Sequence, residues 1–160
     1  MPREVENSQA DPGTPVIVDV TARTTADGSV GFDHEWRWQD GTPGGGKGGI
    51  VIPARGNKDP GTPIHFHLKD LTSPARGLDF TDEANGVMWV KRGESCPGEN
   101  EQCQDPEIPA DQMQRSPNLL KVVNLNNDPC RLHYRLRFKD RDGKSESYDP
   151  DITNGGTNRA

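Results

Sequence analysis

Two histidines in a short alternating segment are the residues of this chain best suited to metal chemistry. His65 and His67 flank a phenylalanine in the sequence IHFHL. On a β-strand, residues two apart share a face and lie about 7 Å from each other. If the strand that carries His133 were a neighbour, three imidazoles would converge and could hold zinc or copper with an open coordination position. A metal-binding protein that uses these three histidines is therefore one prediction.

The same segments also predict a cationic surface on the water-facing side of two strands. Such a surface would bind carboxylate or phosphate groups of a partner through charge-assisted hydrogen bonds. The binding strength of this surface would change with pH, because the histidines titrate at about pH 6 to 7. The alternative is an ordinary solvated sheet face. The predicted binding patch consists of His65, His67, Lys69, His133, Arg135 and Arg137.

The three cysteines of the chain predict at most one internal disulfide. Cys96 and Cys103 bracket the loop sequence CPGENEQC and could close it with a bond that contributes roughly 2 to 3 kcal/mol. Cys130 would then be the remaining thiol. We expect it to be buried and to behave as a small hydrophobic side chain.

Several motifs that resemble functional sites have the wrong spacing. The segment 41–47 fits the G-x-x-x-x-G-K phosphate loop, but Gly48 replaces the required Ser or Thr and a strand follows instead of a helix, so we expect a hairpin loop. A blue-copper site fails because Cys130 and His133 would point to opposite faces and no methionine follows them. In the DRDG sequence at 140–143, the glycine comes too early for a calcium loop. A weak acidic cation site stays open there.

Recognised catalytic motifs are missing from the sequence. It contains neither G-x-S-x-G nor H-E-x-x-H, and it has no dinucleotide-binding fingerprint. We therefore predict no enzymatic activity and no cofactor.

The segment from Asn118 to Tyr148 shows which elements hold these side chains. Even-numbered residues from 130 to 138 are apolar, tyrosine or cysteine, whereas odd-numbered residues from 131 to 139 are basic. This period of two is typical of a strand with one buried face and one wet face. The Asp-Gly pair at 142–143 favours a tight hairpin turn, because such turns need positive φ angles. The segment predicts two long strands, a turn at 126–129 between them, and a short return strand.

Similar patterns upstream predict a fold made only of strands. Alternating or apolar segments occur at 16–23, 30–38, 64–70 and 86–91, with a short one at 50–53. Since helical periodicity is missing, we predict an all-β fold with a single antiparallel β-sandwich of immunoglobulin-like, jelly-roll or Greek-key topology. The β-sandwich domain would occupy residues 15–153, between a flexible arm at 1–14 and a flexible tail at 154–160.

Composition narrows the classes of partner. The chain has 160 residues and a formal net charge of −6, and this acidic balance argues against nucleic-acid binding. It contains no apolar run long enough for a membrane span or a secretory signal, so the cytoplasm is the default expectation. The sheet faces and edge strands would instead offer surfaces for a protein partner or for self-association.

The order of short motifs over residues 60–155 carries a family resemblance. The order IHFHL, GVMWV, a cysteine-bearing loop, LKVVNLNND, HYRLRF and YDPDITNGG resembles small bacterial β-sandwich proteins of unassigned function. The closing Asp-Pro-x-Ile is similar to the end of the inclusion-body (PixA/AidA-like) and DP-EP-type proteins. The resemblance implies a sandwich without known catalysis that sometimes self-associates.

These observations predict a non-catalytic β-sandwich that acts as a binding or self-assembly module. The metal-binding sandwich described above is the alternative. A carbohydrate-binding sandwich is a third option, and it would need an exposed Trp36 or Trp89.

Overall fold

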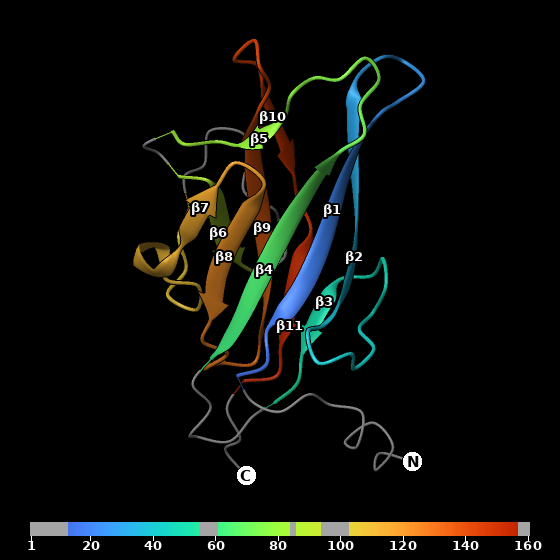
Figure 1. The fold of residues 1–160 in the computed structure, drawn as a ribbon. Helices are drawn as coiled ribbons and strands as arrows, with labels where there is room; N and C mark the ends of the chain where they lie inside the picture. Colours follow the sequence, from blue (N-terminus) through green and yellow to red (C-terminus); the bar gives the residue numbers. More distant parts are fainter. Residues whose placement is uncertain (1–12, 55–60, 84–85, 94–102, 157–160) are drawn as a thin grey trace.

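The computed structural model describes residues 13–54, 61–83, 86–93 and 103–156, and these residues form two β-sheets packed against each other (Figure 1). The described residues contain no α-helix, only a single turn of 3-10 helix, η1 (Ala110–Gln112). The prediction of an all-β sandwich is therefore confirmed.

Sheet A has five strands and carries most of the polar surface discussed below. In spatial order they are β2 (Val30–Trp38), β1 (Val16–Thr24), β4 (Thr62–Asp70), β8 (Leu119–Asn124) and β7 (Gln114–Ser116). The two long central strands, β1 and β4, run parallel to each other, and all other pairs in this sheet are antiparallel.

Sheet B is arranged around β9 (Cys130–Lys139). Leu136 pairs with both Met88 and Tyr148, so β9 has neighbours on both sides. One side holds β5 (Asp79–Phe80) and β6 (Met88–Arg92), and the other holds β10 (Ser145–Tyr148) and β11 (Asp151–Asn154). Strand β3 (Ile50–Ile52) pairs in parallel with β11. The purely antiparallel arrangement that we predicted is thus wrong for two pairs, β1–β4 and β3–β11.

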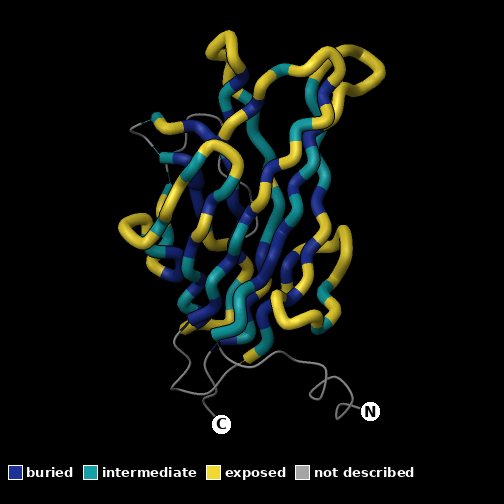
Figure 2. Tube along the Cα trace, viewed as in Figure 1, coloured by how far each residue is buried: buried dark blue, intermediate teal, exposed yellow. Residues whose placement is uncertain are grey.

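The core lies between the sheets and follows the predicted alternation. Leu132, Tyr134, Leu136 and Phe138 of β9 are buried, as are the inward residues of β1 and β4. Exposed residues concentrate in the loops at the ends of the sandwich (Figure 2). Trp36 and Trp89 are only 6% and 2% exposed, so neither offers the open ring that a carbohydrate-binding face requires.

A buried amide network joins the two sheets at one end of the sandwich. Asn124 of β8 and Asn154 of β11 exchange two hydrogen bonds: Asn124 Nδ2 donates to Asn154 Oδ1 at 2.7 Å, and Asn154 Nδ2 donates to Asn124 Oδ1 at 2.9 Å. Asn126 adds two more links, since its Oδ1 accepts the N–H of Gly156 and its Nδ2 donates to the carbonyl of Pro53. The predicted tail at 154–160 therefore contributes Asn154 and Gly156 to the fold, while 157–160 lie outside the described residues.

The glycine-rich segment at 41–49 packs against the edge strand β2. The N–H of Trp36 donates to the carbonyl of Gly46 at 2.9 Å, and the N–H of Trp38 donates to Thr42 at 3.1 Å. A Cβ atom at Gly44 would collide with the Trp36 ring and backbone. The missing side chain is what allows this close approach, so these glycines serve packing, not phosphate binding.

Candidate functional site

The predicted six-residue patch is divided between opposite sides of the molecule. His65, His67 and Lys69 lie on the outer face of β4 in sheet A, whereas the other three residues lie on β9 in sheet B. The outer faces of a sandwich point in opposite directions. The single patch is therefore wrong, and so is the convergence of His65, His67 and His133. In the part of the chain that the structure describes, no three His, Cys, Asp or Glu side chains are grouped to hold a metal ion.

The cationic residues on the sheet B side are paired with carboxylates. Arg135 forms an ion pair with Asp149 at 3.2 Å and donates to Ser147 Oγ at 2.7 Å. Arg137 bonds Glu83 at 2.9 Å and lies 4.5 Å above the ring of Trp89. His133 is only 9% exposed. The odd-numbered positions of β9 are thus largely covered, and this half of the predicted patch is a structural ion-pair surface.

The sheet A side retains an accessible group of cationic and titratable side chains, which we name the β4–β8 face: His65, His67, Lys69 and Lys121. Lys121 lies directly opposite His65 in the register between β8 and β4. Strands β4, β7 and β8 contain a single acidic residue, Asp70, whose carboxylate accepts the N–H groups of Thr72 and Leu78 at 2.9 and 3.0 Å. The outward side of these three strands therefore has no carboxylate of its own.

The pKa of His65 reports the electrostatics of this face. Partial burial lowers it below the usual histidine value, and the positive charge of Lys121 and the neighbouring His67 lower it further. Among the described residues, the four side chains of the β4–β8 face form no ion pair with a carboxylate.

Lys121 is the residue of this face that sequence reasoning did not identify. A signal was present, because Leu120 and Val122 alternate with Lys121 and therefore place it outward. Alternation does not reveal which strand lies alongside, and only the β4–β8 pairing brings Lys121 next to His65.

The buried His34 occupies a different place, between the edge strand β2 and sheet B. Its Nε2 lies 2.8 Å from the carbonyl oxygen of Gly48, and its Nδ1 lies 2.5 Å from the hydroxyl of Tyr148. A carbonyl can only accept, so Nε2 carries a hydrogen and donates it to Gly48, and Nδ1 shares a hydrogen bond with the hydroxyl of Tyr148. Burial, together with the charge of Asp33, raises the pKa of Tyr148 to about 12 and keeps its hydroxyl protonated. Both ring nitrogens are occupied by structural bonds.

The surroundings of Cys130 do not favour nucleophilic chemistry. Cys96 lies outside the described residues, and so the predicted Cys96–Cys103 disulfide does too. Cys130 is partly buried, and burial raises the pKa of its thiol despite the opposing charge of Arg92. Its Sγ is 4.0 Å from the carboxylate of Glu107, which also accepts the N–H groups of Asn127 and Asp128 at 3.0 and 2.9 Å. Glu107 thereby fixes the turn before β9.

The DRDG segment forms the hairpin turn that its sequence favours. Asp140 Oδ1 accepts the N–H groups of Asp142 and Lys144 at 2.9 and 2.8 Å, and its second oxygen pairs with Arg76 at 3.0 Å. Gly143 has a φ of 86°. The carboxylate of Asp140 is therefore committed to the turn and to Arg76.

Comparisons with protein-family models and with curated proteins found no match. The resemblance to the inclusion-body and DP-EP-type proteins accordingly stays a prediction. No helix in the described ranges is both long and apolar enough to cross a membrane.

Proposed function

We propose that this protein is a non-catalytic binding module that recognises anionic groups of a protein partner through the β4–β8 face. The observation that carries the proposal is the contrast between this face and the rest of the molecule. The chain has 25 acidic residues and 19 lysines and arginines, so carboxylates are plentiful. Even so, no carboxylate lies opposite His65, Lys69 or Lys121 in the strand register, and Asp19, which lies opposite His67, is engaged by Arg37 at 2.5 Å.

Arginines elsewhere in the protein show how its cations are normally compensated. Arg76 bonds Asp140 and Glu146, and Arg92 bonds Asp105 and Asp128. On sheet B, Arg131, Arg135 and Arg137 are each paired with a carboxylate as well. Cations that stay uncompensated on an acidic protein favour a role in contacts with a negatively charged surface.

The sheet face supports docking better than the sheet edges do. Strands β3 and β7 have three residues each, and the glycine-rich segment covers β2 at Trp36 and Trp38. Short or covered edges are the means by which proteins avoid unwanted strand pairing. We therefore assign the partner to the face, and a second copy of this acidic chain is the first partner to test.

Sedimentation velocity of the full chain at low and high salt tests the proposal. We expect a larger species that forms with increasing concentration and dissociates as salt screens the contact. The substitution Lys121→Gln should weaken this association. Lys144→Gln is the matched control, because it removes the same charge from an exposed turn on the other sheet.

Poly-L-glutamate serves as a second probe in case the partner is a different acidic protein. The proposal requires that it bind the wild type at low salt and bind Lys121→Gln less tightly. The proposal would be overturned if the wild type remains monomeric and binds poly-L-glutamate no more tightly than Lys121→Gln does.

A further inference from the structure

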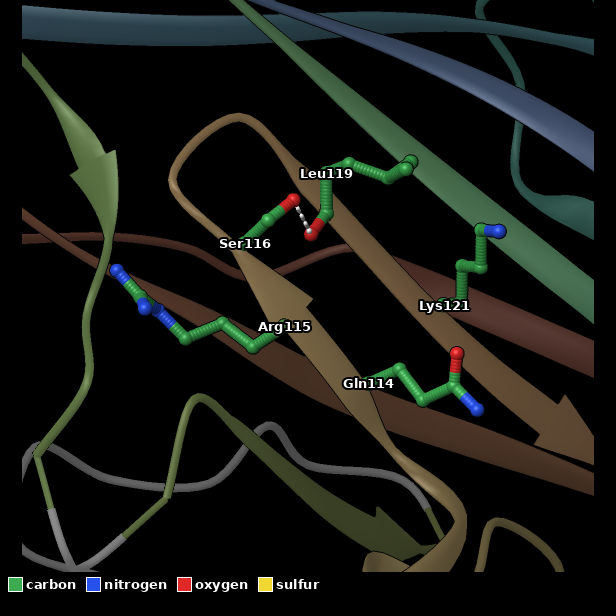
Figure 3. A pocket seen from close by; sticks show the side chains of 5 residues that line it. All are labelled: Gln114, Arg115, Ser116, Leu119 and Lys121. Carbon is green, nitrogen blue, oxygen red and sulfur yellow. Dashed lines mark hydrogen bonds between the residues drawn. The ribbon is translucent and has the colours of Figure 1, made fainter.

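A hollow beside the β4–β8 face lies between β7 and β8. It has a volume of about 200 Å3 and is lined by Gln114, Arg115, Ser116, Leu119 and Lys121. In Figure 3 the side chains of Lys121 and Gln114 lie on the same side of the hairpin, whereas Arg115 points away toward the chain near β5. The volume corresponds to several water molecules at about 30 Å3 each, so a small tetrahedral or planar anion fits.

Strand register explains why these donors meet. Lys121 is paired with His65 of β4 on one side and with Gln114 of β7 on the other. Side chains directly opposite each other on neighbouring strands have Cβ atoms about 4.5 to 5.5 Å apart. One cross-strand row therefore presents an imidazole, an ammonium group and a side-chain amide.

The lining of the hollow contains two cations and no carboxylate. Arg115 Nε and Nη2 donate to the carbonyl oxygen of Phe80 at 2.9 and 2.8 Å, which fixes the guanidinium without neutralising its charge. The Ser116 hydroxyl donates to the carbonyl of Leu119 at 3.3 Å and shapes the turn. Hydrogen bonds to backbone carbonyls thus fix the side chains of Arg115 and Ser116, and no carboxylate in the lining compensates the positive charge.

We propose that this hollow is an oxyanion site that takes a sulfate, phosphate or carboxylate group, with Lys121 and Gln114 as direct donors. The proposal rests on the proposed function, because it assigns to one place on the β4–β8 face the group that the partner presents. Oxyanions match these donors because ammonium and amide N–H groups form short, charge-assisted bonds to them.

His65 makes binding at this hollow depend on pH. The groups that face it are Lys121 of β8, His67 of its own strand, and Ile17 of β1, with Asp19 one row further along. The Asp19 carboxylate is paired with Arg37 of β2 at 2.5 Å. Partial burial lowers the pKa of His65 most, and the charges of Lys121 and His67 lower it further. An anion beside Lys121 offsets the repulsion from these charges, so binding takes up a proton. Affinity consequently rises as the pH falls.

Titration of the isotopically labelled full chain with sodium sulfate, followed by NMR at ionic strength matched with sodium chloride, tests the site. Sulfate keeps its charge over the working range, so any pH dependence belongs to the protein. We expect saturable shifts of the Gln114 side-chain amide and of the β7 and β8 backbone amides. Lys121→Gln should weaken binding about tenfold or more, since it removes a charged donor.

Control variants separate the hollow from a general effect of charge. Lys144→Gln removes the same charge from an exposed turn on the other sheet, and it should change the affinity by no more than about twofold because the charge is distant and screened. Gln114→Ala should weaken binding about threefold, as expected for one neutral hydrogen bond. Lowering the pH from about 8 to about 5.5 should tighten sulfate binding in the wild type and much less in His65→Gln.

The outcomes distinguish this inference from the proposed function. Linear shifts equal to those with chloride, or equal losses in Lys144→Gln and Lys121→Gln, would overturn the oxyanion site even if poly-L-glutamate binds. Saturable sulfate binding without self-association or poly-L-glutamate binding would keep the site and overturn the proposed function. Displacement of poly-L-glutamate by sulfate would show that the hollow takes a partner's carboxylate, and sulfate binding without displacement would show a free anion as the ligand.

Discussion

The amide pair between the sheets allows a quantitative test of what holds the sandwich together. Asn124 and Asn154 are 0% and 3% exposed, and they bond each other through both amide groups at 2.7 and 2.9 Å. Asn124 Oδ1 also accepts the N–H of Asn126 at 3.2 Å. Asn154→Leu has nearly the same shape but leaves Asn124 Nδ2 buried without an acceptor. An orphaned buried donor costs about 1 to 3 kcal/mol, so we expect a loss of about 2 kcal/mol.

A double-mutant cycle isolates the pair from the rest of the network. Asn124→Leu should cost somewhat more than Asn154→Leu, because it also orphans the N–H of Asn126. The double variant should cost clearly less than the sum of the two, since replacing both partners by apolar groups leaves no unpaired amide between them. Urea unfolding followed by circular dichroism measures all four proteins. With a slope of about 2 kcal/mol per molar, the single variant should unfold about 1 M earlier.

Two results would refute this account of the amide pair. One is additivity of the two substitutions within about 0.5 kcal/mol, which would mean that the amides do not depend on each other. The other is a single-variant loss no larger than that of Asn118→Ala, an exposed turn residue whose substitution should change stability by less than about 0.5 kcal/mol.

Three further predictions concern other parts of the fold. Tyr148→Phe removes the hydroxyl that is hydrogen-bonded to His34 Nδ1 and should lower the unfolding free energy by about 1 kcal/mol in urea titrations. An unchanged midpoint would contradict the contribution of this bond. Gly44→Ala places a methyl group against Trp36, so it should lower the free energy of unfolding by about 1 to 3 kcal/mol and shift the tryptophan emission to longer wavelength. Gly48→Ala is the control: the nearest atom to its methyl group would be 3.3 Å away, so stability and emission should change little. The backbone N–H of Lys144 and the ion pair with Arg76 hold the pKa of Asp140 below its usual value. The ionised carboxylate therefore stabilises the fold at pH values above the usual aspartate pKa, and this stabilisation is lost as the pH falls through the lowered pKa of the folded state. The free energy of unfolding should therefore fall less steeply from neutral to acid pH in Asp140→Asn than in the wild type. Parallel pH profiles of the two proteins would exclude this contribution of Asp140.

Local patterns predicted the strands well because alternation is a property of neighbouring residues. Leu132, Tyr134, Leu136 and Phe138 of β9 are buried as their period of two requires, although Cys130 is only partly buried and His133 is buried as well, and the Asp-Gly pair forms the expected turn. Sheet membership depends instead on contacts between distant segments, which periodicity does not encode. The parallel β1–β4 pair, the separation of His133 from His65 and the pairing of Lys121 with His65 all depend on such contacts. The wet side of β9 was only partly predicted, since Glu83 and Asp149 cover its arginines.

The central position of β9 has a consequence for how the chain is made. Four other strands form hydrogen bonds with it, and the strand begins only at Cys130 of 160 residues. In the other sheet, Val16 must find Ile64 across an intervening crossover. Contacts so remote in sequence are slow to form. A ribosome must therefore release the chain through β9 before the strands of sheet B have a template, and chains that stop short of β9 would present unpaired strands to chaperones.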